Sequence, residues 1–354
     1  MARLSSGPAS LYASHAEESG AIEAKVNVAA STGVLSLRRM NIARGHAGGG
    51  SGFIMDRLCA TTPPPASNGT PKGQGRDGGG EPLAGAGAPL GARLRILDLR
   101  HLASPLGCLP LKHRHNHGSA PGPDVFTALK TLLLDHSDLE LLAEPPEAFK
   151  GLVSLNKLSA TYNRFGDESA PARLARSKSE GGHHAIGDMP AGLHELLLAG
   201  NGLRDGFMNK MKRPPSSSTD PSTHSSTNSS TDYSMDLDPG CSILEACTRL
   251  EIINLDVNRL TEVPRELTSP WPGRAGLCEL SFMGNAITFI PSLIGELTGL
   301  KRIALDYNQI TKDGLPPSLF EDTALERITL TGNPIAQSEF MRLPGPYHKF
   351  YSNE

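Results

Sequence analysis

The chain has 354 residues, a formal net charge of −3, and 38 glycines and 28 prolines. This slightly acidic balance argues against a nucleic-acid-binding surface, which normally shows strong clustered basicity, and no apolar run reaches the roughly 20 residues that cross a bilayer. The five cysteines form no Cys-x-x-Cys pair, and their odd number argues against a framework of disulfide bonds. We therefore expect no nucleic acid, no membrane and no cofactor among its ligands.

The N-terminal part of the chain is poor in structural signals. Residues 1–30 are interpreted as an N-terminal extension, which lacks the apolar core of a signal peptide and the second-position glycine of a myristoylation signal. Residues 31–42 contain a candidate first repeat strand that ends at Leu37, because apolar and polar residues alternate there. Residues 43–92 are a low-complexity insertion, too poor in large apolar side chains to offset the entropy of ordering. We expect a cytoplasmic location.

One template recurs from residue 93 onward: Leu-x-x-Leu-x-Leu-x-x-Asn-x-Leu, with other apolar residues accepted in place of leucine. Weaker copies start at Leu94 and Leu129, where Leu102 and Ser137 take the asparagine position. The clear copies start at Leu155, Leu193, Leu250, Leu277, Leu300 and Leu325. The last four asparagines lie 27, 23 and 25 residues apart, and a period of roughly 20 to 29 residues is typical of a leucine-rich-repeat solenoid.

The physical demands of such a repeat explain its residue types. Apolar residues separated by one position share a face of a strand, and one unit cannot bury its apolar face alone, so the units must stack. The α/β fold class predicted is a solenoid with a parallel sheet on the concave face. Proline after each bend favours short helical or 3₁₀ segments on the convex face. The asparagine amide can bond backbone groups at the bend, which predicts a structural ladder of Asn163, Asn201, Asn258, Asn285, Asn308 and Asn333.

The repeats also define the domain organisation. We divide the rest of the chain into degenerate repeats (93–205, with insertions at 103–124 and 166–189), a Ser/Thr-rich disordered insertion (206–240), regular repeats (241–336) and a C-terminal cap (337–354). The cap is rich in aromatic residues, and a solenoid must cover the core of its last repeat.

This repeat resembles that of the intracellular leucine-rich-repeat proteins of the Ras-suppressor and plant Ras-group type. The segments that begin at Ser31 and at Leu325, the latter with Asn333-Pro334-Ile335, are similar to the small cytosolic members that consist of little more than repeats. The resemblance implies a curved solenoid that binds proteins, with no catalytic residues. Relatives keep tight repeats, whereas insertions interrupt this chain.

A protein partner would be bound through the side chains that the sheet displays. Tyrosine and arginine are frequent binding hot spots, and aspartates can act as charged partners. The predicted partner-binding residues are Lys157, Tyr162, Asp256, Arg302, Asp306, Tyr307 and Arg327. The function predicted is a non-catalytic, monomeric interaction scaffold or adaptor, with intracellular signalling as a context. The alternative is a structural or regulatory subunit of a larger enzyme complex of the phosphatase or ubiquitin ligase type.

Two insertions carry further hypotheses. Ser177 and Ser179 follow Arg173 and Arg176 at a spacing that basophilic kinases favour, so both are candidate phosphorylation sites. A remote alternative function is metal binding through the His-rich insertion, because imidazole is the commonest transition-metal ligand. Its histidines are His113, His115 and His117, with His183 and His184 further along. No P-loop, dinucleotide turn, nucleophile elbow or zincin motif occurs, so we predict no enzyme activity.

Overall fold

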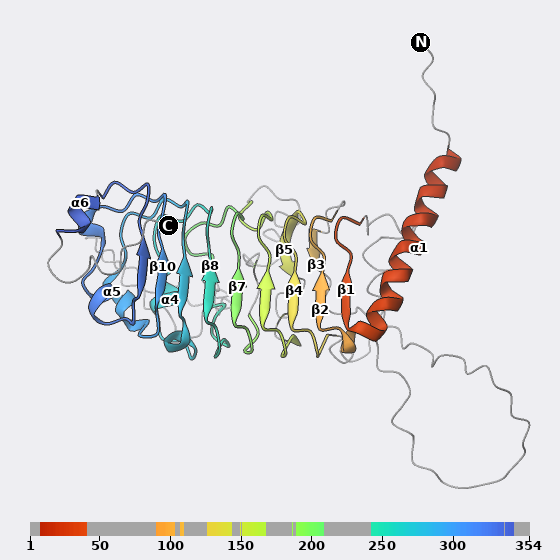
Figure 1. Ribbon diagram of the computed structural model, residues 1–354, viewed down its shortest axis with the longest axis horizontal. Coiled ribbons are helices and arrows are strands. Elements are labelled where there is room, and N and C mark those ends of the chain that lie inside the picture. Colours follow the sequence, from red (N-terminus) through yellow and green to blue (C-terminus); the bar gives the residue numbers. More distant parts are fainter. Residues whose placement is uncertain are drawn as a thin grey trace, which may run out of the picture.

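In the computed structural model, nine short strands form one parallel sheet along the length of the molecule (Figure 1). The structure describes residues 8–40, 90–102, 107–109, 126–143, 149, 151–167, 186, 189–208, 242–335 and 337–342. The strands of the sheet, in spatial order, are β1 (Val34–Ser36), β2 (Ile96–Asp98), β4 (Thr131–Leu133), β6 (Lys157–Ser159), β7 (Glu195–Leu197), β8 (Ile252–Asn254), β9 (Glu279–Ser281), β10 (Arg302–Ala304) and β11 (Arg327–Thr329). The predicted leucine-rich-repeat solenoid is confirmed.

Neighbouring strands pair at equal template positions, so the inward residues of successive repeats stack on one another. Ile253 aligns with Leu280, and Leu280 aligns with Ile303. Strand β7 pairs directly with β8, so the sheet runs without a break past residues 209–241, which separate the two strands in sequence. The degenerate and the regular repeats therefore belong to one solenoid.

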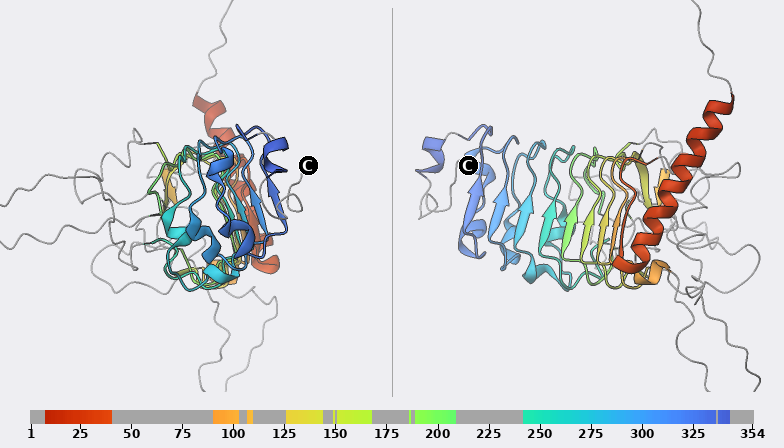
Figure 2. Two further views of the ribbon diagram at one scale, coloured as in Figure 1. Left: turned by 90° about the vertical axis from the view of Figure 1, so that its left-hand side faces the viewer. Right: turned by 45° about the vertical axis from the view of Figure 1, so that its right-hand side comes forward.

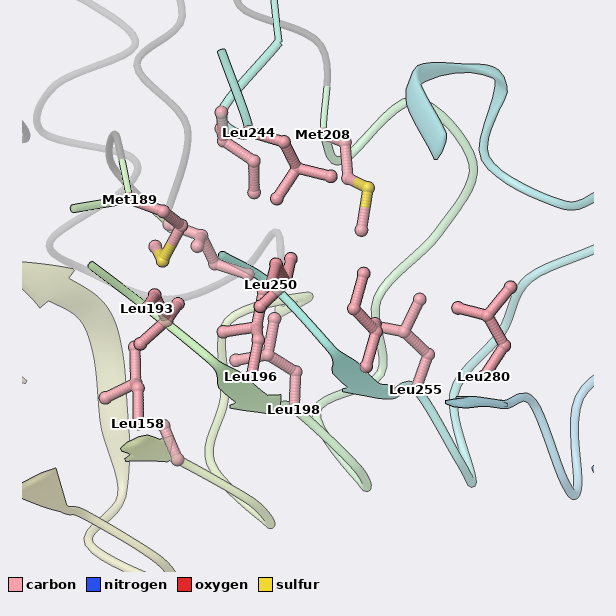
Figure 3. Close-up of a cluster of buried hydrophobic side chains, with 14 of the residues drawn as sticks. Leu158, Met189, Leu193, Leu196, Leu198, Met208, Leu244, Leu250, Leu255 and Leu280 are labelled. Atoms are coloured by element: carbon pink, nitrogen blue, oxygen red, sulfur yellow. The ribbon is translucent and has the colours of Figure 1, made fainter. Parts of the chain in front are cut away.

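The core follows the same period. Leu198 and Leu255 are fully buried behind their strands, and each buried leucine contributes about 1.5–3 kcal/mol of hydrophobic stabilisation. Figure 3 shows Met208 and Leu244, one from each side of residues 209–241, over the same leucines. The Ile243 N–H donates to the Met208 carbonyl across 3.1 Å. This part of the core is thus shared by the two flanks of the Ser/Thr-rich segment.

Short helices cover the side of the core opposite the sheet. They are η1 (Leu90–Arg93), α4 (Arg265–Thr268), η3 (Arg274–Gly276), η4 (Ser292–Glu296), η5 (Lys312–Gly314) and α5 (Ser318–Glu321). Pro264, Pro291 and Pro317 directly precede α4, η4 and α5, where the missing N–H costs nothing because the first helical N–H groups have no partner. The prediction of short helical and 3₁₀ segments is confirmed.

A helix occupies the N-terminal end of the solenoid, in a segment that the sequence presented only as an extension. Helix α1 (Pro8–Thr32) lies beside β1 at the end of the sheet (Figures 1 and 2) and contacts this strand. Ile22, Val26 and Ala29 are buried, and their spacing of four and three residues places them on one helical face. This face covers the apolar side of the first repeat, which no preceding repeat shields. At the other end, α6 (Gln337–Phe340) places Phe340 against Phe320, with ring centroids 6.1 Å apart.

Strand β3 (Gly107–Leu109) pairs in parallel with β5 (Leu139–Ala143) in a second, two-stranded sheet. Strand β3 falls within residues 103–124, so part of that predicted insertion is ordered as strand. The candidate sites at Ser177, Ser179 and His113 to His117 lie outside the described residues, as do His183 and His184. Among the described helices, none has the length and apolarity of a transmembrane span.

Candidate functional site

The bends that follow the strands are held by buried asparagine side chains. The Asn258 Oδ1 accepts the N–H groups of Asn201 and Leu203, both at 3.0 Å, while its Nδ2 donates to the Leu198 and Leu255 carbonyls. All six predicted asparagines make equivalent bonds between repeats. In the degenerate repeat that starts at Leu129, serine replaces the asparagine. The Ser137 hydroxyl donates to the Leu99 carbonyl at 2.7 Å, as Asn258 Nδ2 donates to the Leu198 carbonyl.

In three repeats an aspartate at the seventh template position, Asp135, Asp256 or Asp306, ties the repeat to the next one. These bonds lie on the face that the sheet displays, which we call the sheet face. The Asp256 carboxylate accepts the Ser281 hydroxyl at 2.5 Å and the Met283 N–H at 2.7 Å. The Asp306 carboxylate likewise accepts the Thr329 hydroxyl and the Thr331 N–H. Asp306 is buried at 6% exposure, so the geometry gives these two predicted partner-binding residues a structural role.

Replacing Asp306 with alanine should lower the free energy of unfolding by about 2 kcal/mol, because hydrogen bonds to a charged acceptor each contribute about 1.5–3 kcal/mol. Urea denaturation followed by circular dichroism measures this loss. The exposed Asp313 on η5 provides a matched control, and its alanine variant should change stability by less than about 0.5 kcal/mol. Equal effects of the two substitutions would show that the aspartate bonds contribute nothing specific.

The predicted basic residues are mostly engaged with acids on the neighbouring strand. Lys157 on β6 pairs with Glu195 on β7, and the Arg302 guanidinium donates to Glu279 through Nε at 2.8 Å and Nη2 at 2.6 Å. The hydrogen bond to Glu279 raises the pKa of Arg302 above its already high ordinary value. Arg327 is aligned with Arg302 on the next strand and is half-buried. These cross-strand pairs place fixed charges on the sheet face.

The eighth template position forms a continuous edge along the sheet face, and its backbone is left-handed in every repeat. Glycine occurs there at three positions, Gly200, Gly284 and Gly332, with φ between +67° and +74°. The other residues are Arg39, His101, His136, Tyr162, Val257 and Tyr307, with φ between +53° and +61°. A left-handed conformation costs a non-glycine residue roughly 1–2 kcal/mol, and for a β-branched residue it is a clear outlier.

Three of these strained residues expose large apolar surface. Tyr307 is 62% exposed, Val257 52% and Tyr162 50%. The Tyr307 ring lies against Gly332, where an added Cβ would come within 2.6 Å of the ring. Each tyrosine is therefore supported by the next repeat and presents the rest of its ring to solvent.

Sequence reasoning found Tyr162 and missed the two histidines beside it. The rings of His101 and His136 stack at a centroid distance of 4.6 Å and 8°, and His136 stacks on Tyr162 at 4.6 Å and 7°. All three occupy the eighth position of consecutive repeats. If the repeats are aligned at their ninth position, where Leu102 and Ser137 replace asparagine, then His101, His136 and Tyr162 fall in the same column. Such an alignment could have identified the two histidines.

A pocket lies on the helical side, away from these residues. Its volume is about 310 Å³, and it is lined between α4 and η4 by Val263, Phe289 and Leu293 among others. Phe289 and Leu293 are 49% and 57% exposed. Within the described ranges, no group of three His, Cys, Asp or Glu side chains could hold a metal ion.

Comparison with known proteins finds partial similarity to curated proteins and to solved structures. No protein-family model matches the chain. The chain is 24% identical to lumican of Rattus norvegicus over 213 residues, which are 58% of this chain and 52% of lumican. Lumican of Gallus gallus is 24% identical over 211 residues, with 59% and 52% covered. The chain thus spans about half the length of the curated relatives it matches.

Solved structures of similar arrangement include human 5T4 (Wnt-activated inhibitory factor 1, trophoblast glycoprotein), at 20% identity and a TM-score of 0.41, with 69% of this chain and 71% of 5T4 covered. Internalin C2 of Listeria monocytogenes matches at 16% identity and a TM-score of 0.41, with 74% and 83% covered. The narrower resemblance to the Ras-suppressor type stays a prediction. The recurring template, the asparagine ladder and the single parallel sheet together give this chain the fold of a leucine-rich-repeat solenoid.

Proposed function

We propose that the chain is a non-catalytic interaction scaffold that binds a protein partner through the sheet face. Within this proposal it acts as a monomer in the cytoplasm, the setting that its resemblance to the Ras-suppressor type implies. The proposed contact centres are Tyr162, Val257 and Tyr307 on the eighth-position edge, with Lys157, Arg302 and Arg327 as charged neighbours.

The observation that carries the proposal is the coincidence of backbone strain with exposure at the eighth position. Glycine meets the left-handed requirement at Gly200, Gly284 and Gly332 without steric cost. At Val257 and Tyr307 a large side chain is held in the same conformation and is more than half exposed. Strained residues tend to cluster at functional sites, and tyrosine contributes large contact area at low conformational entropy.

The test compares two variants of the full chain, each lacking two exposed large apolar side chains. Replacing Tyr162 and Tyr307 together with alanine should weaken the complex with a partner recovered from the native cell by about 30-fold or more, since a hot-spot truncation costs about 2 kcal/mol or more. Isothermal titration calorimetry with the recovered partner measures the change.

The matched control replaces Phe289 and Leu293 with alanine on the helical side, and it should bind as tightly as the unaltered chain. Circular dichroism shows whether both variants retain the fold. A partner lost only from the Phe289 and Leu293 variant would move the binding surface to the pocket between α4 and η4. A partner that both variants retain would contradict the proposal.

A further inference from the structure

The sheet face is segregated by charge, although the whole chain is slightly acidic. The first two repeats place Arg38, Arg39 and Arg100 at the seventh and eighth positions. The three central repeats, which start at Leu193, Leu250 and Leu277, carry Glu195, Asp256 and Glu279 on this face instead. None of the three has a lysine or arginine at the displayed positions, which are the third, fifth, seventh and eighth of the template. The N-terminal part of this face therefore favours an anionic partner.

The acids nearest to these arginines are already engaged. The Asp98 carboxylate accepts the Arg100 Nε and Nη2, both at 2.9 Å, and lies 3.2 Å from the Ser36 hydroxyl. Burial alone would raise the pKa of Asp98, but the hydrogen bonds from Arg100 and Ser36 hold it below its ordinary value. Arg38 and Arg39 are exposed, and within the described part of the chain no salt bridge occupies either guanidinium. Their donors remain available to a partner.

The stacked rings extend this cationic edge. His136 is covered on both faces, by His101 on one side and by Tyr162 on the other. The Tyr162 ring in turn lies against Gly200, where an added Cβ would come within 2.4 Å of the ring. His136 and Tyr162 therefore offer ring edges with N–H and O–H groups to solvent, while His101 lies at the open end of the stack. Ring edges of this kind suit carboxylates, whereas stacking of a nucleobase needs a free ring face.

The charge of this edge depends on pH. Partial desolvation, followed by the neighbouring His136 and the nearby arginines, lowers the pKa of His101 below its ordinary value. Charged and titratable groups flank His101 on its own repeat and on both neighbouring repeats: Arg38, Arg39, Asp98, Arg100, Asp135 and His136. A bound carboxylate would favour the charged imidazolium, so its binding takes up a proton and tightens as the pH falls below the ordinary histidine pKa of about 6.5.

We propose that Arg38, Arg39, His101, His136 and Tyr162, together called the N-terminal edge, bind an acidic segment of a protein partner. The inference rests on the proposed binding function and names the chemistry of the partner. Arginine forks hold the carboxylates at any pH, and the His101 imidazole adds charge on acidification. Tyr162 supports the stack and supplies a hydroxyl.

The probe is a fluorescein-labelled peptide of about twelve alternating Glu and Asp residues, which stays ionised above a pH of about 5. Its binding to the full chain is measured by fluorescence anisotropy in low salt at a pH of about 7.5 and of about 5.5. Acidification should tighten binding about threefold, because one added surface charge, on His101, contributes about that much.

Two double variants separate the contributions. Arg38→Gln with Arg39→Gln should weaken peptide binding on the order of tenfold at both pH values. His101→Gln with His136→Gln should leave the affinity at the higher pH unchanged and abolish the tightening on acidification. The matched control, Arg265→Gln with Lys312→Gln, removes two exposed charges from the helical side and should bind like the unaltered chain.

Several results would overturn the inference. One is peptide binding that is absent at both pH values, and another is equal weakening in the control. Tighter binding of a single-stranded RNA of the same charge would assign the edge to nucleic acid instead. Light scattering that shows self-association on acidification would assign it to a second copy of this chain. The chain could fail to bind the acidic peptide and still bind the partner recovered from the native cell through Tyr162 and Tyr307. That result would overturn this inference and leave the proposed function standing.

Discussion

Replacing Asn258 with alanine should lower the free energy of unfolding by about 3–5 kcal/mol, because a buried polar group left without its partner costs about 1–3 kcal/mol. The Asn258 side chain is 8% exposed. It accepts two backbone N–H groups from the preceding bend and donates to the carbonyls of Leu198, Leu255 and Asp256. Alanine leaves the N–H groups of the buried residues Asn201 and Leu203 without their acceptor. Urea denaturation followed by circular dichroism measures the loss.

Asn254 in the same repeat is the matched control. Its side chain is half-buried on the sheet face, and among the described residues it bonds to Asp256, through Nδ2 at 2.8 Å and by accepting the Asp256 N–H at 3.0 Å. Solvent can replace these bonds, so Asn254→Ala should cost about 1 kcal/mol or less. If Asn258→Ala costs no more than Asn254→Ala, the ladder does not hold the bends, and the leucine core alone fixes the repeat.

The buried half of the repeat could be predicted from the sequence because each repeat meets the same physical demand there. Leu250, Leu277 and Leu300 face one core, and the asparagine at the ninth position meets the same unpaired backbone in each bend. Even Ser137 fits, since its hydroxyl reaches the Leu99 carbonyl. Where every repeat requires an apolar side chain or a hydrogen-bonding side chain at the same position, the same residue type recurs in the sequence with the period of the repeat.

The residues of the sheet face could be predicted only in part. Their interactions depend on the side chains of neighbouring repeats, which the repeat period does not specify. The sequence indicated that Asp306 was a free charge available to a partner. In the structure its carboxylate accepts the Thr329 hydroxyl and the Thr331 N–H of the next repeat. The stack of His101, His136 and Tyr162 joins residues that lie far apart in sequence. Helix α1 was missed because its contact with the core is one narrow face, formed by Ile22, Val26 and Ala29.

Replacing Gly299 with alanine should destabilise the fold by about 3 kcal/mol, because added volume in a closely packed place forces the backbone to shift. A Cβ at Gly299 would lie 2.2 Å from the carbonyl oxygen of Ala275 and 3.4 Å from that of Leu277. Both atoms belong to the backbone of the preceding repeat. The substitution therefore has to separate the repeats that contain strands β9 and β10. These two strands pair with each other, so their hydrogen bonds depend on the spacing of the repeats.

Gly276 is the internal control, since it precedes Leu277 as Gly299 precedes Leu300. A Cβ there meets only the Leu250 oxygen, at 4.0 Å, which is ordinary contact, so Gly276→Ala should change stability by less than about 0.5 kcal/mol. Neither glycine has a positive φ, so the comparison isolates the effect of space from that of backbone conformation. A large loss for Gly299 alone would show that repeat spacing is fixed by backbone contact, whereas equal small effects would show that the stacked repeats can separate to admit a methyl group.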